Sequence, residues 1–417
     1  MQFEEKTEEG MMDRFKCHWF VVLLVAVIAG IVVFAPTALL AQSKKPETLT
    51  MFLEIMPAQD SASVQAYWTA ERMAKAIPKP LPVRSLSEKK AGPTTTVTLT
   101  PTGSKVIANS GMAGDKRTEQ RGPATAIKIP GTAEKTVIQP LWGIPGTPFA
   151  FTRYRVFPDT KKTYQIWPYY LVGKLFFTGP DGVDYVASAS VINANNNSVV
   201  WTAGHCVWDP GYGLPNHNFY FEPGYYYSKG KYGVWTAYAL VTIDAWANYG
   251  QLEYDLGALV MNRSKKKLIG QVLGFLGWAT NLATYPQDYY QHWHLQGYPQ
   301  APRPLYPHTP PGAQFDGQHL EFNAAGFGDY DWPSGDYGLD PTVGVGCDLT
   351  GGCSGGPWVL DFSSVAGDNN KVNGNNSYRY VDQNGNPVYP EYLKLYSPYF
   401  GDAADLVRDL AQFVPVP

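Results

Sequence analysis

The chain has 417 residues and a formal net charge of −3, with 28 tyrosines, 12 tryptophans, 41 glycines and 34 prolines. A net charge this close to zero gives no support to a nucleic-acid partner or to a strongly charged one. The length allows two or three domains, and the widely spread glycines and prolines favour many short strands and turns over long helices.

An almost wholly apolar segment at residues 20–41 follows two basic residues. It is either a secretory signal that is cleaved after Ala41 or an uncleaved anchor, since a segment of this length is enough to span a bilayer. The small residues near its end favour cleavage. We therefore assign residues 1–41 to a signal peptide or signal anchor. We expect a secreted or extracytoplasmic protein, which is attached to a membrane only if this segment is retained.

Residues 42–140 differ in character from the rest of the chain. They are polar and rich in proline and threonine, apart from apolar stretches at residues 49–56 and 64–77. The second stretch is compatible with one amphipathic helix. This region is either a disordered linker or a propeptide that is removed after export, and the sequence supports both interpretations equally. We expect it to have low order.

The pattern from residue 164 onward is that of short strands. Residues 170–177 and 185–192 are apolar runs separated by a Gly-Pro-Asp-Gly turn, which predicts a hairpin. Residues 198–202 form another apolar run, and residues 256–261 are short and apolar, as buried strands are. The clearest helix is at residues 401–413, where Asp402 can cap the first turn and one apolar stripe recurs, formed by Leu406, Val407, Leu410 and Phe413.

Two motifs contain residues suited to nucleophilic catalysis. His205 lies in Val-Trp-Thr-Ala-Gly-His-Cys, and Ser354 lies in Thr-Gly-Gly-Cys-Ser-Gly-Gly-Pro. A serine is a poor nucleophile unless a base takes its proton, and the attacked carbonyl needs donors for its developing charge. Asp255, which precedes an apolar run, can orient the histidine. The chain order His, Asp, Ser is one of the orders known for such triads.

These two motifs, in this order, resemble those of the trypsin-like serine peptidase superfamily, and details resemble its bacterial, glutamyl-endopeptidase-like branch. The resemblance covers roughly residues 145–417. It implies an all-β peptidase domain at residues 141–417, with two six-stranded antiparallel β-barrels of chymotrypsin type at roughly 165–265 and 266–400. It also implies that the C-terminal helix at residues 401–413 docks on the second barrel.

The resemblance implies a role for each residue of the motifs. Ser354 is the expected nucleophile of an acyl-enzyme mechanism, and His205 is the expected general base and then general acid. Asp255 is expected to orient the imidazole, with Asp244 as its competitor. The backbone N–H groups of Gly352 and Ser354 are expected to form the oxyanion hole. The implied activity is that of a serine endopeptidase with a protein or peptide substrate.

One position departs from the pattern of trypsin. The residue before the nucleophile is Cys353, whereas trypsin has an aspartate there that pairs with a new N-terminal amine. This difference puts activation by an N-terminal salt bridge in doubt. Cys17 precedes the apolar segment and cannot join the disulfides of the exported domain. The pairing of Cys206, Cys347 and Cys353 stays open, because their number is odd and the usual partner of a cysteine after the histidine is missing. Cys206 is compatible with a buried free thiol.

Three residues are candidates for substrate binding by the same resemblance. Asp348 lies where trypsin carries its pocket aspartate, while Ser377 and Arg379 lie on the strand expected to pair with the substrate backbone. If Asp348 and Arg379 pair, the pocket is nearly neutral. If Asp348 alone faces the substrate, cleavage after Lys or Arg is expected, and if Arg379 alone does, cleavage after acidic residues. The bacterial resemblance slightly favours the last alternative.

We expect no cofactor and no metal. His292 and His294 would share one face of a strand, but no third ligand is evident. A monomer is expected. The alternative function is a catalytically silent, tyrosine-rich binding module on the same scaffold. The complete His-Asp-Ser set speaks against it, because a silent module has no need for all three residues.

Overall fold

The computed structural model describes residues 49–56, 61–89, 107–114, 149–156, 166–227, 231–282, 291–303, 314–365 and 369–417. The predicted signal or anchor segment and Cys17 lie outside these ranges. All elements below belong to one compact unit, which extends from Pro46 to Pro417. In the ranges given, no helix is both long enough and apolar enough to cross a membrane.

Six antiparallel strands close into a first barrel, because β13 pairs with both β12 and β14. In chain order they are β7 (Val172–Thr178), β8 (Asp184–Val191), β9 (Val199–Thr202), β12 (His217–Pro223), β13 (Trp235–Ile243) and β14 (Gly257–Met261). The predicted hairpin is confirmed, since β7 pairs with β8 over its full length. All residues of β7 and β9 are buried, which explains why these strands lack an alternating pattern.

A second antiparallel barrel follows. In chain order its strands are β17 (His292–Gly297), β18 (Glu321–Asp331), β19 (Thr342–Gly346), β20 (Pro357–Leu360), β21 (Lys371–Asn375) and β23 (Lys394–Pro398). The ring closes just after β21, where Ser377 donates its N–H to the carbonyl of Tyr396 and Tyr396 donates to Tyr378. The predicted pair of six-stranded barrels is therefore confirmed.

Shorter elements connect or extend the two barrels. They are η3 (Tyr169–Leu171), α4 (Gly204–Val207), β10 (Trp208–Asp209), β11 (Leu214–Pro215), α5 (Asp244–Ala247), η4 (Leu252–Tyr254), α6 (Ile269–Leu273), β15 (Gly274–Phe275), β16 (Gly277–Thr280), β22 (Arg379–Val381) and η6 (Glu391–Leu393). Before the first barrel, β4 (Ile107–Asn109), β5 (Met112–Ala113) and β6 (Phe151–Arg155) pair with β16, β15 and β18 respectively.

The low order expected for residues 42–140 does not hold for residues 49–56 and 61–89. These residues form β1 (Met51–Ile55), α2 (Ser61–Tyr67), α3 (Ala70–Lys75), β2 (Ile77–Pro78), β3 (Val83–Ser85) and η1 (Leu86–Glu88). Several of their apolar side chains join the core, and Val64 and Trp68 are almost fully buried. Burial of this apolar surface offsets the entropy cost of ordering a segment that is polar on average.

The apolar stretch at residues 64–77 forms two short helices, so the expectation of a single helix is wrong. The helix is interrupted at Trp68, whose indole N–H donates to the carbonyl oxygen of Asn218 at 2.6 Å. Thr69 then caps α3 by accepting the N–H of Arg72. The hydrogen bond of Trp68 to the first barrel and the N-cap formed by Thr69 favour two helices over the single helix that the periodicity predicts.

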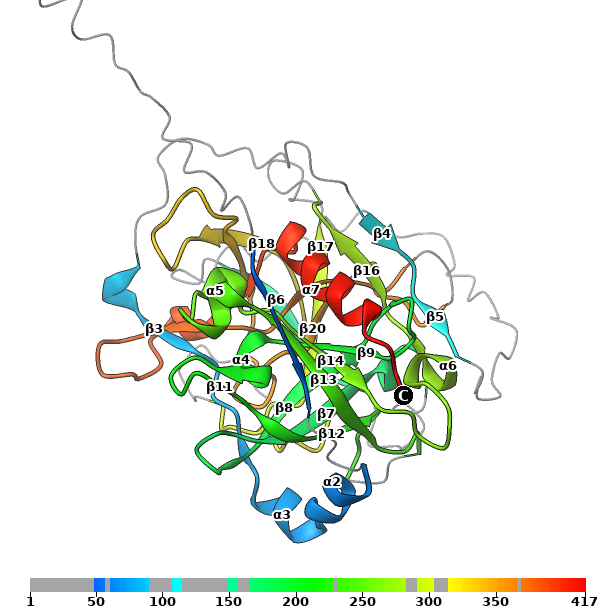
Figure 1. The fold of residues 1–417 in the computed structure, drawn as a ribbon. Helices are drawn as coiled ribbons and strands as arrows, with labels where there is room; N and C mark the ends of the chain where they lie inside the picture. Colours follow the sequence, from blue (N-terminus) through cyan, green and yellow to red (C-terminus); the bar gives the residue numbers. More distant parts are fainter. Residues whose placement is uncertain are drawn as a thin grey trace, which may run out of the picture. The chain divides into compact units, whose positions relative to one another are not determined.

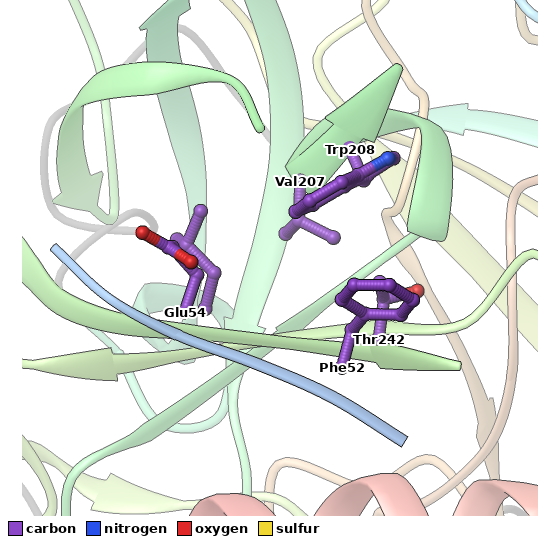
Figure 2. Close-up of a pocket in the computed structure, with 6 residues that line it drawn as sticks. Phe52, Glu54, Val207, Trp208 and Thr242 are labelled. Atoms are coloured by element: carbon purple, nitrogen blue, oxygen red, sulfur yellow. The ribbon is translucent and has the colours of Figure 1, made fainter. Parts of the chain in front are cut away.

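The strand β1 extends the sheet of the first barrel by pairing antiparallel with β13. Its Phe52 packs on Trp208 with ring centroids 5.0 Å apart. Both rings line a small hollow together with Glu54, Val207 and Thr242 (Figure 2). The N-terminal segment therefore rests directly on the residues that follow His205.

The C-terminal helix α7 (Asp402–Phe413) is confirmed, but it packs mainly against β13 and β14 of the first barrel (Figure 1), whereas we expected the second. Its buried apolar face is built from Ala403, Ala404, Val407 and Ala411. Phe413, which the periodicity placed in the apolar stripe, is 73% exposed. The small alanines allow the helix to approach the barrel closely, which larger side chains would prevent.

Candidate active site

The pairing of β14 with β9 brings His205 and Asp255 together across 50 residues of sequence. His205 lies in α4, directly after β9, and Asp255 lies between η4 and β14. The ring Nδ1 of His205 is 2.8 Å from Oδ2 of Asp255, and the backbone N–H of His205 donates to Oδ1 at 2.7 Å. Because a carboxylate only accepts, Nδ1 carries the hydrogen. The alternative residue, Asp244, instead accepts a hydrogen bond from Asn248.

Asp255 is fully buried, and its second partner is a residue that we expected to bind substrate. The hydroxyl of Ser377 donates to Oδ2 of Asp255 at 2.5 Å. Ser377 is itself fully buried. Its side chain therefore lies where it positions the carboxylate and not where it would touch a substrate side chain.

The environment of His205 favours its charged form. Burial alone would lower the pKa of the imidazole, but the carboxylate of Asp255 outweighs this effect and holds the pKa above its ordinary value of 6.5. The other ring nitrogen, Nε2, is buried and has no hydrogen-bond partner among the described residues. This nitrogen is the one left to exchange a proton with a nucleophile.

Ser354 lies in a tight turn that requires its glycines. Gly352 has a φ of 96°, and a Cβ there would lie 2.7 Å from the carbonyl oxygen of Tyr298. Gly355 has a φ of 74°, and its Cβ would overlap the hydroxyl of Thr202. The backbone N–H of Ser188 on β8 donates to the carbonyl of Ser354 at 2.8 Å. The turn of the second barrel is thus fixed against the first.

The candidate oxyanion hole contains a carbonyl group from the same chain. The N–H of Gly352 donates to the carbonyl oxygen of Lys79 at 3.2 Å, and the hydroxyl of Ser354 donates to the same oxygen at 3.3 Å. Lys79 follows β2 in the N-terminal segment, and the sequence analysis gave no sign of this contact. The predicted nucleophile and one predicted oxyanion donor therefore converge on one peptide carbonyl.

The cysteines near the site are free and buried. Cys206, Cys347 and Cys353 form no disulfide. Burial raises the pKa of Cys353 to about 12 and also raises that of Cys347. Since the thiolate is the reactive form, the thiols of Cys347 and Cys353 are poor nucleophiles at neutral pH.

The carboxylate of Asp348 is buried in an ion-pair cluster. Its Oδ2 lies 2.9 Å from Nε of Arg303 and 3.8 Å from a guanidinium nitrogen of Arg153, and Asn323 donates to Oδ1 at 3.1 Å. Arg303 lies in a proline-rich loop, 45 residues before Asp348 in the chain, and no local pattern in the sequence connects the two. The negative charge of Asp348 is thus balanced by arginines that the sequence analysis missed.

Arg379 does not pair with Asp348. Its guanidinium donates to the carbonyl oxygen of Leu349 and to that of Tyr392, the latter at 2.8 Å. Among the described residues, no carboxylate lies within ion-pair distance of Arg379, which is 7% exposed. The two charges that we expected to share one pocket therefore have different partners.

The histidine pair on β17 is packed among aromatic side chains. His294 stacks on Phe362 with ring centroids 4.9 Å apart, and burial lowers the pKa of His294 to about 4. No group of three His, Cys, Asp or Glu side chains suited to a metal ion occurs in the part of the chain that the structure describes.

Solved structures provide the comparison with known proteins, because no family profile and no curated protein matches the chain. The protease Anisep from Arthrobacter nicotinovorans is 31% identical over 59% of this chain and 97% of its own, with a TM-score of 0.47. The thermostable serine protease AL20 from an extremophilic microorganism is 31% identical over 59% of this chain and 99% of its own, with a TM-score of 0.45.

The identity to both proteases extends over nearly their whole length. The chain is therefore a member of the trypsin-like family of serine peptidases.

Proposed function

We propose that the protein is an exported serine endopeptidase that hydrolyses peptide bonds through Ser354, His205 and Asp255. The observation that carries the proposal is the carbonyl of Lys79, which accepts from both the hydroxyl of Ser354 and the N–H of Gly352. A site that holds a peptide carbonyl next to a nucleophile and a backbone donor supports a role in acyl transfer.

In the first half of the proposed reaction, Nε2 of His205 takes the proton of Ser354 while Oγ forms a bond to the substrate carbonyl carbon. The carbonyl π electrons move to the oxygen, and the N–H groups of Gly352 and Ser354 stabilise the negative charge. Such a donor is worth on the order of 100- to 1000-fold in rate. His205 then gives its proton to the leaving nitrogen, the C–N bond breaks, and an ester to Ser354 remains.

In the second half, a water molecule attacks the ester carbonyl while His205 takes a proton from the water. The C–O bond to Ser354 breaks and Oγ takes the proton back, so that the enzyme is restored and a carboxylic acid is released. Asp255 keeps the hydrogen of His205 on Nδ1 and stabilises the imidazolium formed in each half, and Ser377 holds the carboxylate in place.

The charges near the site favour acidic side chains before the scissile bond. Asp348 is matched by Arg303, whereas the partners of the buried guanidinium of Arg379 among the residues that the structure describes are carbonyl groups. A buried cation without a counter-ion is costly, and a substrate carboxylate would supply one. We therefore propose a preference for Glu or Asp at this position.

The test of the proposed activity is covalent labelling with a fluorophosphonate probe, followed by peptide mapping. The proposal expects one adduct, on Ser354, and none in Ser354→Ala. Absence of labelling and hydrolysis in a folded protein whose active site is accessible would favour a silent binding module instead.

A further inference from the structure

Residues 76–85, which we name the strap, cross the candidate active site from one barrel to the other. At one end β2 pairs parallel with β8, and the N–H of Lys79 donates to the carbonyl of Val186 at 2.8 Å. At the other end β3 pairs parallel with β22, and the N–H of Arg379 donates to the carbonyl of Pro82 at 3.2 Å. Between these ends lies the contact of Lys79 with Ser354.

The strap engages the groups that the proposed reaction needs. While the hydroxyl of Ser354 donates to Lys79, it does not donate to His205, whose Nε2 has no partner among the described residues. The N–H of Gly352 is occupied by the same carbonyl oxygen. A substrate carbonyl cannot enter this position until the carbonyl of Lys79 has left it.

The direction of the strap is unsuited to cleavage. The chain before the Lys79 carbonyl lies against the first barrel, which carries His205: the N–H of Lys79 donates to the carbonyl of Val186 on β8, and Nζ of Lys79 is 3.8 Å from Asp209, four residues after His205. The nitrogen of Pro80, which would have to leave, continues towards β22. Because His205 must protonate the leaving nitrogen, a cleavable chain has to run in the opposite direction.

The strap is also rigid and firmly held. Prolines alternate at positions 78, 80 and 82, which fixes φ at each and restricts the preceding residues to extended conformations. Leu81 is 5% exposed and belongs to the same apolar cluster as Leu349 and Cys353. Gln300 donates to the carbonyl of Ala76 at 3.0 Å. A pre-formed segment that is tethered in place competes strongly with a free peptide.

We propose that the strap is a built-in inhibitor that binds backwards across the peptidase site and must be displaced before substrates can enter. The inference rests on the proposed function, and it deepens the propeptide alternative for residues 42–140 by assigning inhibition to a defined segment. The ordered residues before the strap, which pair and pack against the first barrel, anchor it.

The test compares the full-length protein with Leu81→Asp and a matched control, Val83→Asp. Both variants add one carboxylate to the strap, but Val83 is 54% exposed, so that only the change at Leu81 buries an unpaired charge. The measurements are the rate of labelling of Ser354 by a fluorophosphonate probe and the hydrolysis of a mixed set of fluorogenic peptides. Circular dichroism reports whether each protein is folded.

We expect slow labelling in the wild type and in Val83→Asp. Labelling should be at least about tenfold faster in Leu81→Asp, because the fraction of molecules whose strap has left the active site rises. A synthetic peptide of residues 76–85 should slow the labelling of Leu81→Asp again and stay intact. Cleavage of that peptide at the Lys79–Pro80 bond would overturn the backward orientation. If Leu81→Asp does not fold, Gln300→Ala, which removes the donor to Ala76, takes its place with the same expected direction.

Two negative results are distinguishable. Equally fast labelling of the wild type and Leu81→Asp would overturn the inhibitory role and leave the proposed function intact. Three folded proteins that neither react with the probe nor hydrolyse peptides would overturn the proposed function, and the inhibitory role with it.

Discussion

The replacement Asp255→Asn probes how the candidate triad is held together. One oxygen of Asp255 accepts the backbone N–H of His205, and the other accepts the ring Nδ1–H of His205 and the hydroxyl of Ser377. An asparagine keeps one acceptor but presents an NH2 group to the two remaining donors. His205 is then forced to carry its hydrogen on Nε2, where it cannot accept the proton of Ser354.

The expected loss in kcat for Asp255→Asn is about 10⁴-fold, the effect of the wrong tautomer in peptidases of this mechanism. This corresponds to about 5.4 kcal/mol of transition-state stabilisation, at 1.36 kcal/mol per decade. The assay is peptide hydrolysis in the Leu81→Asp background, where the strap is weakened. Ser377→Ala is the matched control, because it removes one donor from the same oxygen and leaves the carboxylate facing His205.

For this control, a loss on the order of tenfold is expected, since one hydrogen bond to a charged group is removed. Equal losses in Asp255→Asn and Ser377→Ala would refute the reasoning, because they would mean that Asp255 acts only through the packing of the site.

Four other outcomes are expected. The kcat/KM of the Leu81→Asp protein should fall as the pH drops through the pKa of His205, because the base must be neutral to accept a proton. The midpoint of this fall should lie above pH 6.5, because the carboxylate of Asp255 raises the pKa of His205. A midpoint below pH 6.5 would contradict this. Arg379→Ala should reduce the preference for acidic residues before the cleaved bond, measured with a peptide library. Asp348→Asn should lower the free energy of unfolding by about 3–5 kcal/mol, measured by urea unfolding, because it leaves Arg303 buried without its partner. Protein recovered outside the cytoplasm should begin after Ala41, which intact-mass analysis checks; retention of residues 20–41 would favour the anchor.

The sequence was most informative at positions where the local backbone restricts which residue types are possible. Gly352 and Gly355 around Ser354 have backbone conformations that few other residues can adopt, and a Cβ at Gly204, before His205, would lie 2.8 Å from the side chain of Trp246. The two motifs are therefore visible in the sequence. The strands of the first hairpin were also predictable, because a glycine- and proline-containing turn separates two apolar runs. Such signals involve few residues and depend little on the rest of the fold.

Other features depend on contacts between residues that are distant in sequence. The position of Lys79 against Ser354 joins residues 275 positions apart, and nothing in the local pattern indicates it. The pairing of Arg303 with Asp348 is of the same kind. The docking of α7 on the second barrel was expected from the resemblance alone, and it was wrong. The sequence of the helix could not correct it, because the buried face consists mainly of alanines, which hydrophobic periodicity weights less than the exposed Phe413.

The most direct test of the central claim is the site and rate of fluorophosphonate labelling in the Leu81→Asp protein, with and without the additional change Ser354→Ala. We predict a single adduct, on Ser354. The double variant should keep its fold and lose all labelling, and its peptide hydrolysis should fall by several orders of magnitude, because triad members act as a unit. Equal hydrolysis in the two proteins, or an adduct on another residue, would contradict this prediction.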